Sequence, residues 1–295
     1  MQDDGLELRE KVPKLNTPVL RSRIVMPFKL DTYLQRLGLS DVPSGIDGLH
    51  QLQFAQICAL PFENVYPYLG RVPSLDEEDL WQKLVVDLCG GFCFELNVLL
   101  GLALKQLGYA GKPVLARVRM GAPEGGARTH LAHVVTHQGT EWLVDAGFGS
   151  QAPFHPVNIS SGREQEIRGH LFRIRRDDIA GEQVLERKTE TGWLPLFGFD
   201  RVAPRAIDLE ASTFLAARWP REPFSSSIKA YRGTETGWIS FQDGRASIVE
   251  NGSKRSWELN SASELTDFLR LEMDLGYPAE DLAAVADRLL STGPA

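Results

Sequence analysis

The chain of 295 residues exceeds the roughly 100 to 200 residues of a typical single domain, so two or three packed units are expected. Its 43% hydrophobic and 24% charged residues are typical of a globular protein and exclude a disordered or fibrous one. Its 32 basic and 39 acidic side chains give a net charge of -7, which disfavours nucleic acid and anionic membrane surfaces as partners.

Membrane insertion, secretion and metal binding are also disfavoured. No apolar run approaches the ~18 residues of a membrane helix, and residues 1–25 lack the apolar core of a signal peptide, so we expect a cytoplasmic protein. The three cysteines are too few for a disulfide framework. Because Cys89 and Cys93 have no second pair of Cys or His nearby, we expect no metal site.

Helical spacing of apolar residues dominates the first part of the chain. It predicts three helices between residues 30 and 85, and a fourth apolar stripe runs from Leu96 to Leu107 and ends at a glycine. Gly90 and Gly91 lead into this last helix. The spacing therefore places Cys93 at the N-terminus of a helix.

Beyond Pro113 the apolar pattern alternates with period two, as in strands. Two of the predicted strands are joined by a Gln138-Gly139 turn. Helices, then strands, then a mixed tail predict an α+β fold. The predicted strands cover 114–120, 131–137, 141–146, 172–175, 237–241 and 246–249, and helical spacing returns at 265–269 and 282–289.

The position of Cys93 suits a nucleophile. A thiol attacks as the thiolate, which the unpaired N–H groups and dipole of a helix N-terminus favour. The two preceding glycines allow backbone and substrate to approach closely. The alternative is an inert buried cysteine, as most free cysteines are. The assignment therefore depends on whether a base and an orienting carboxylate lie beside the sulfur.

The register of the predicted hairpin selects one of three histidines as that base. Across a two-residue turn, residues that share a face are separated by an odd number of positions. His130 meets this condition with Asp145, whereas His133 and His137 do not. The register makes His130 and Asp145 diagonal neighbours about 7 to 8 Å apart at the backbone, within reach of a hydrogen bond. Gly147, opposite His130, leaves space beside the ring.

The order Cys93, His130, Asp145 describes a thiol triad. Together with GGFCFELN around the cysteine, PFEN at 61–64 and LVDAGFG at 143–149, it resembles the arylamine N-acetyltransferases over roughly residues 26 to 290. The resemblance implies a helical domain, a β-barrel domain and an α/β lid around a cysteine-protease-like core. The expected boundaries are 1–25 for an N-terminal extension, 26–112 for the helical domain, 113–212 for the barrel and 213–295 for the lid.

The resemblance also implies a ping-pong acyl transfer. Cys93 would take an acetyl group from acetyl-CoA, the co-substrate, and pass it to the nitrogen, or the hydroxylamine oxygen, of an arylamine or hydrazine. No metal is implied. His130 would draw the proton from Cys93, and Asp145 would fix the tautomer of the ring.

Four further residues match positions of the family's site, and a fifth, Asn97, is expected there from its place on the helix. Phe62 and Phe148 are expected to line the pocket for the aromatic acceptor, where flat rings pack well. Thr129 and Gly147 are expected beside the donor channel. Asn97, one helical turn after the cysteine, is expected to hold the triad carboxylate by a side-chain hydrogen bond.

The sequence departs from the family at three places. Cys89 replaces the arginine that usually precedes the two glycines, so a cation that could brace the loop is lost. Segment 218–224 carries two arginines and a bulky ring where small hydroxyl residues are frequent, and Ser150 stands where some relatives have arginine. The arginines of that segment could grip the phosphates of the donor or be solvated.

Three alternatives to arylamine acetylation stay open. An amide synthase that forms macrolactams would use the same triad with a carrier-bound acyl donor. A thiol hydrolase similar to papain-like peptidases would replace the amine by water. A binding protein would retain the scaffold with a disabled site. The natural acceptor and the oligomeric state do not follow from the sequence.

Overall fold

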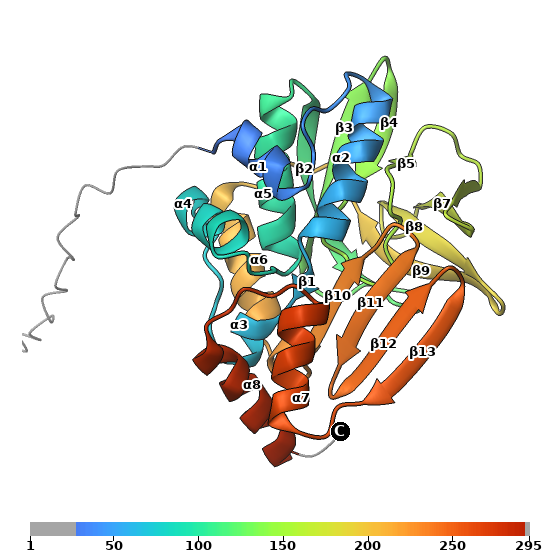
Figure 1. Cartoon of the computed structure of the whole chain (residues 1–295). Coiled ribbons are helices and arrows are strands. Elements are labelled where there is room, and N and C mark those ends of the chain that lie inside the picture. Colours follow the sequence, from blue (N-terminus) through green and yellow to red (C-terminus); the bar gives the residue numbers. More distant parts are fainter. Residues whose placement is uncertain (1–27, 293–295) are drawn as a thin grey trace, which may run out of the picture.

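The computed structural model describes residues 28–292, so the predicted N-terminal extension, residues 1–25, lies outside the described residues. Helices, many of them from the first third of the chain, gather on one side of two antiparallel sheets (Figure 1). Within the described residues, no helix combines the length and apolar character needed to cross a membrane. The α-helices are α1 Leu30–Arg36, α2 Ile46–Ala59, α3 Val65–Tyr68, α4 Glu77–Trp81, α5 Cys93–Gln106, α6 Ala206–Arg218, α7 Ala262–Asp267 and α8 Ala279–Thr292; shorter turns are η1 Gln82–Val86, η2 Pro223–Ser225 and η3 Phe268–Glu272.

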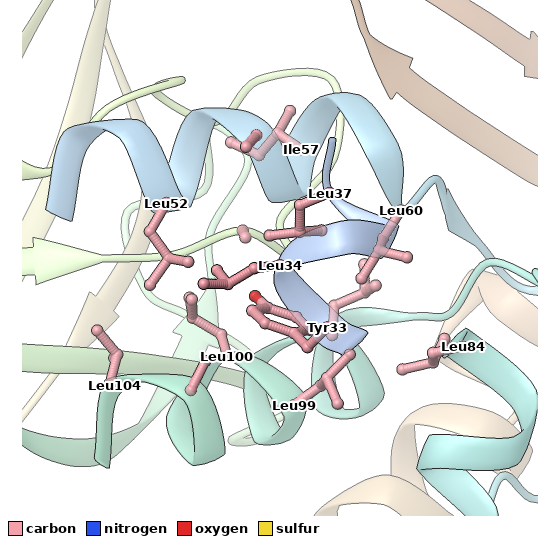
Figure 2. Packing of buried hydrophobic residues seen from close by; sticks show 14 of the residues in the cluster. Tyr33, Leu34, Leu37, Leu52, Ile57, Leu60, Leu84, Leu99, Leu100 and Leu104 are labelled. Atoms are coloured by element: carbon pink, nitrogen blue, oxygen red, sulfur yellow. The ribbon is translucent and has the colours of Figure 1, made fainter. Parts of the chain in front are cut away.

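The helical part has its own apolar core. Figure 2 shows Tyr33 and Leu34 of α1 between α2 and α5, with Leu52 on one side and Leu99 and Leu100 on the other. All five side chains are buried. The three- and four-residue spacing of these side chains is what predicts helices here, and the structure confirms α1, α2 and α5 to within a few residues.

The larger sheet has the strand order β5-β4-β3-β2-β9-β8-β7-β6. Its two ends approach each other, since the backbone N–H of Asn158 in β5 donates to Oε1 of Gln165 in β6 at 2.7 Å. The sheet therefore nearly closes into a barrel. Its strands are β2 Ala110–Val118, β3 His130–His137, β4 Thr140–Val144, β5 Val157–Asn158, β6 Gln165–Ile167, β7 His170–Asp177, β8 Glu182–Thr189 and β9 Gly192–Phe199.

The hairpin of β3 and β4 has the predicted register. His137 pairs with Thr140, and Gln138 and Gly139 both have positive φ, 50° and 77°, as a two-residue hairpin turn of type I′ requires. One detail of the prediction is wrong: β4 ends at Val144, so Asp145 follows the strand instead of lying on it.

The smaller sheet pairs one strand from the helical N-terminal part with four strands from the C-terminal part. The two-residue strand β1, Phe62–Glu63, pairs with β10, so that Phe62 lies opposite Tyr231. Helices α7 and α8 pack on this sheet (Figure 1), for example through Leu265 and Leu282. Its other strands are β10 Lys229–Gly233, β11 Gly237–Gln242, β12 Arg245–Glu250 and β13 Ser253–Glu258, in the order β1-β10-β11-β12-β13.

The whole is an α+β fold with a helical N-terminal part, a near-barrel sheet and a mixed α/β C-terminal part. The sequence pattern did not indicate α6, β8 or β9. The expected boundary between residues 212 and 213 falls within α6, and the division into domains stays a prediction.

Candidate active site

Cys93 is the first residue of α5, as the sequence predicts. The preceding Phe92 has extended backbone, and its N–H donates to Oε2 of Glu95 at 3.0 Å, one half of a capping box. A Cβ at Gly90 would come within 2.5 Å of the carbonyl oxygen of Pro61. The glycine before the helix is thus required for contact with the PFEN segment, which the sequence did not indicate.

His130 and Asp145 form the hydrogen-bonded pair that the register predicts. Nε2 of His130 lies 2.7 Å from Oδ2 of Asp145, and both side chains are buried. Oδ1 of Asp145 accepts from Nδ2 of Asn97 and from the backbone N–H of Gly147, each at 2.8 Å. Burial alone would raise the pKa of Asp145. The charge and hydrogen bond of His130, together with hydrogen bonds from Gly147 and Asn97, bring that pKa below its usual value.

Gln53 is a member of this network that sequence reasoning missed. Its Oε1 accepts from the backbone N–H of Asp145 at 3.1 Å, and its Nε2 donates to the carbonyl oxygen of Pro153 at 2.9 Å. Gln53 comes from α2, far from the hairpin in sequence. A single glutamine on a helix carries no signal of such a contact.

The surroundings of Cys93 act on the pKa of its thiol in opposite directions. Burial, and then the charge of Asp145, raise the pKa of the thiol, whereas the backbone N–H groups of Phe94 and Leu131 lower it. With a neutral imidazole nearby, these surroundings keep the thiol protonated. A thiolate here therefore depends on a cation beside it, which His130 becomes when it takes the proton.

Cys93 and His130 open onto one cavity of about 490 Å³. Sγ of Cys93 lies 3.5 Å from the carbonyl oxygen of Thr129, the residue before His130. Asn97 and Asp145 lie behind the lining, where they hold the imidazole. Six of the eight residues predicted for the site line the cavity: Phe62, Cys93, Thr129, His130, Gly147 and Phe148.

His133 belongs to the core instead of the cavity. Its Nε2 lies 2.6 Å from the carbonyl oxygen of Asn97, to which it donates, and its ring packs on Gly101 in α5. His133 is thus a buried structural residue. The odd separation in sequence that favours His130 over His133 as the partner of Asp145 agrees with the structure.

The asparagine of PFEN attaches the C-terminal part of the chain to the site. Nδ2 of Asn64 donates to the carbonyl oxygens of Phe224 and Ser227 at 2.7 and 2.8 Å, and its Oδ1 accepts from the N–H of Lys229 at 2.6 Å. This places Phe224 and the nearby Glu222 in the lining of the cavity. The sequence did not indicate a role for either of them.

The arginines of the same segment lie elsewhere. Arg218 donates to the carbonyl oxygen of Gly70, and the guanidinium of Arg221 lies 5.4 Å from the centre of the Trp219 ring. Neither lines the cavity. The cations that do line it are Arg187, Lys229 and Lys254, from strands of the two sheets.

The expectation that Cys89 leaves the loop without a cation is wrong. Nζ of Lys83, in η1, lies 2.8 Å from Oε1 of Glu95 and 3.3 Å from Oε1 of Glu63. The hydroxyl of Tyr277 also donates to Glu63, at 2.8 Å. All of these side chains are buried. Burial would lower the pKa of Lys83, but Glu63 and Glu95 raise it above its usual value, so the lysine carries a charge.

Within residues 28–292, no three His, Cys, Asp or Glu side chains gather as the ligands of a metal ion would. The three cysteines are free thiols.

Comparison with known proteins agrees with this geometry. Residues 45–281 match the family described as N-acetyltransferase. The arylamine N-acetyltransferase of Mycolicibacterium smegmatis is 30% identical over 277 residues, which cover 90% of this chain and 100% of that protein. The solved structure of Mycobacterium marinum arylamine N-acetyltransferase in complex with CoA has a TM-score of 0.81 at 27% identity, covering 88% of this chain and 99% of that one.

A relative with a different named activity also matches. Proansamycin X synthase of Amycolatopsis mediterranei is 29% identical over 178 residues, which cover 58% of this chain and 67% of that protein. The family match extends over most of the chain, and the curated M. smegmatis relative aligns along its whole length. This chain belongs to the arylamine N-acetyltransferase family and is an acyltransferase.

Proposed function

We propose that this protein transfers an acetyl group from acetyl-CoA to the nitrogen of an arylamine or hydrazine, or to the oxygen of an N-hydroxyarylamine. The observation that carries the proposal is one cavity that contains a cysteine at a helix N-terminus and an imidazole held by a buried carboxylate. The reaction would be ping-pong, with an acetyl thioester on Cys93 between the two halves.

In the first half, His130 accepts the proton of the Cys93 thiol. Asp145 accepts the hydrogen bond from Nε2 of His130, which leaves Nδ1 for the sulfur and stabilises the imidazolium. The thiolate attacks the acetyl carbonyl carbon of acetyl-CoA. The backbone N–H groups of Phe94 and Leu131, which act on the sulfur, would serve as donors for the oxyanion. The C–S bond to CoA breaks, and the CoA sulfur takes the proton from His130.

In the second half, the acceptor enters the same cavity after CoA leaves. Its nitrogen attacks the thioester carbon, His130 takes a proton from that nitrogen, and the C–S bond to Cys93 breaks. The proton then returns to the cysteine sulfur. The two rings of Phe62 and Phe148 in the lining suit a flat aromatic acceptor.

The cavity also suits the donor. The reacting acetyl end of the donor is uncharged, whereas its nucleotide end carries phosphates. Arg187, Lys229 and Lys254 supply cations in the lining, contributed by β8, β10 and β13. Thr129 and Gly147 line the same cavity at the thiol, and Gly147 allows its backbone to pack against the cysteine, since a Cβ at Gly147 would lie 2.9 Å from Cα of Cys93.

The test is formation of the acyl-enzyme. Brief exposure to acetyl-CoA should add one acetyl group to Cys93 by mass spectrometry, and an aniline should remove it with stoichiometric release of acetanilide. His130→Ala and Asp145→Ala should slow formation of the adduct by roughly 10³-fold or more. The matched control is His133→Ala, which should retain the wild-type rate. An adduct on another residue, or none, would contradict the proposal.

Alkylation of the cysteines distinguishes an active site from a catalytically disabled one. Burial raises the pKa of the Cys58 thiol to about 11, and no histidine within residues 28–292 acts on it. Iodoacetamide at neutral pH should therefore modify Cys93 much faster than Cys58 if His130 ionises it. Equal rates would support a binding protein on an acyltransferase scaffold.

The amide synthase is the second candidate, favoured by the similarity to proansamycin X synthase. It would use the same thioester chemistry with a longer acyl chain delivered by a carrier. The two candidates separate when the protein is offered acetyl-CoA and an aniline. Amine-dependent release of free CoA thiol supports acetyl transfer, whereas loading of Cys93 only from long-chain thioesters supports the synthase.

A further inference from the structure

Glu222 is a carboxylate in the cavity that the proposed reaction does not use. Its Oε1 lies 3.2 Å from Oγ1 of Thr129, and Thr129 in turn contacts the sulfur of Cys93 through its carbonyl oxygen. Glu222 follows α6 and precedes the turn η2, and it lines the cavity together with Cys93 and His130.

Among residues 28–292, no cation forms an ion pair with this carboxylate, and its side chain hydrogen-bonds the hydroxyl of Thr129. Burial raises the pKa of Glu222, and the hydrogen bond from Thr129 opposes this. The neighbouring Arg221 lies over Trp219 instead. The ordinary pKa of a glutamate, about 4.3, lies far below 7, so Glu222 adds a negative charge to the cavity at neutral pH.

The charge acts at the end of the cavity where the chemistry occurs. The charges of Asp145 and Glu222 both raise the pKa of the Cys93 thiol, so both are felt at the sulfur. Asp145 is occupied by His130, Asn97 and Gly147. Glu222 is the one of the two that faces the cavity, and by itself it opposes formation of the thiolate.

We propose that Glu222 makes the thiol end of the cavity a site for cationic acceptors, that is, arylamines or hydrazines that carry a positive substituent beside the reacting nitrogen. This inference rests on the proposed function. A substrate cation would pair with the carboxylate in a partly desolvated site, where such a pair is stronger than in water. An anionic substituent, such as a benzoate, would be repelled by the same charge.

The test compares three meta-substituted anilines with the same donor: a trimethylammoniomethyl, a methyl and a carboxylate substituent. Each offers one reactive nitrogen, so kcat/KM reports the effect of charge. The wild-type protein should prefer the cation over the anion. Glu222→Gln should reduce the ratio of cation to anion by roughly tenfold, and high salt should reduce it in the wild-type protein alone. Glu222→Asp keeps the charge and should keep the order.

A matched control is Glu210→Gln, which removes the same charge from an exposed position of α6. It should leave the ratio unchanged. A ratio in Glu222→Gln within twofold of the wild-type value, with the methyl acceptor still acetylated, would overturn the inference.

A second measurement does not depend on acetyl transfer. Cationic and anionic methanethiosulfonates form a disulfide with a cysteine and release sulfinate, so the ratio of their rates at Cys93 reports the local potential. A Cys58→Ser background removes the one partly exposed thiol among the three cysteines. Glu222→Gln should lower the ratio roughly tenfold, and an unchanged ratio overturns the inference. If the ratio falls while no aniline is acetylated, the anionic site stands and the proposed acetyl transfer fails.

Discussion

Lys83 pairs with two buried carboxylates near Cys93, and its replacement tests whether a cation stabilises the segment that leads into α5. Lys83→Met keeps the length of the side chain but removes the cation that lies 2.8 Å from Glu95 and 3.3 Å from Glu63. Removal of one partner from a buried ion pair costs about 3–5 kcal/mol, because the remaining charge is left uncompensated. Here two carboxylates lose their shared partner, so we expect a cost in that range.

The cost would appear in the free energy of unfolding, measured by urea denaturation monitored by tryptophan fluorescence. The control is Lys112→Met, which removes an exposed lysine of β2 and should change stability by less than about 0.5 kcal/mol. Because Glu95 also accepts from the N–H of Phe92, at the start of α5, alkylation of Cys93 in the variant should slow as well.

The position of Cys89 offers a rescue. Its thiol lies close enough for Glu63 and Lys83 to act on its pKa, so a long side chain there would reach the same carboxylates. Cys89→Arg combined with Lys83→Ala should recover part of the stability that Lys83→Ala loses. If Lys83→Met costs less than 1 kcal/mol, or the arginine recovers nothing, the cluster does not depend on a cation and the reasoning is refuted.

Three further outcomes follow from buried contacts. His133→Ala should lower the free energy of unfolding by about 1–3 kcal/mol, because the carbonyl oxygen of Asn97 loses its donor; unchanged urea denaturation would contradict this. Gly147→Ala should slow acyl-enzyme formation, since its Cβ would lie 2.7 Å from Nδ2 of Asn97, and a wild-type rate would show that the site yields easily. Burial lowers the pKa values of His50, His133 and His155. The unfolded chain takes up their protons below about pH 6.5 and the folded chain does not, so stability should be complete above that pH and decline as pH falls. A urea midpoint equal at pH 7.5 and 5.5 would contradict the last prediction.

The parts of the site that depend on short-range geometry could be predicted from local sequence patterns. The register of β3 and β4 follows from a two-residue turn and the period of a strand, so His130 could be distinguished from His133 by counting. The start of α5 follows from two glycines and an apolar stripe. Both features involve neighbouring segments, for which sequence separation and spatial separation are closely linked.

The rest of the site depends on contacts between distant segments, which carry no local signal. Asn64 holds the backbone around Phe224, and Lys83 pairs with Glu63 and Glu95 across three elements. The sequence shows that Cys89 departs from the family's motif. It does not show that Lys83 supplies the charge instead, since Lys83 lies before the motif, in η1. The sequence distinguishes Glu222 only as part of an unusual segment.

The pairing of β1 with β10 has a consequence for biosynthesis. Phe62 and Tyr231 belong to opposite ends of the chain, and Glu63 receives a hydrogen bond from Tyr277. The Cys93 thiol emerges from the ribosome long before these partners exist, and contacts of such sequence separation form slowly. A nascent chain that stalls before residue 231 would therefore expose Cys93 with an incomplete pocket, so that oxidants and electrophiles in the cell would reach the sulfur before any substrate does.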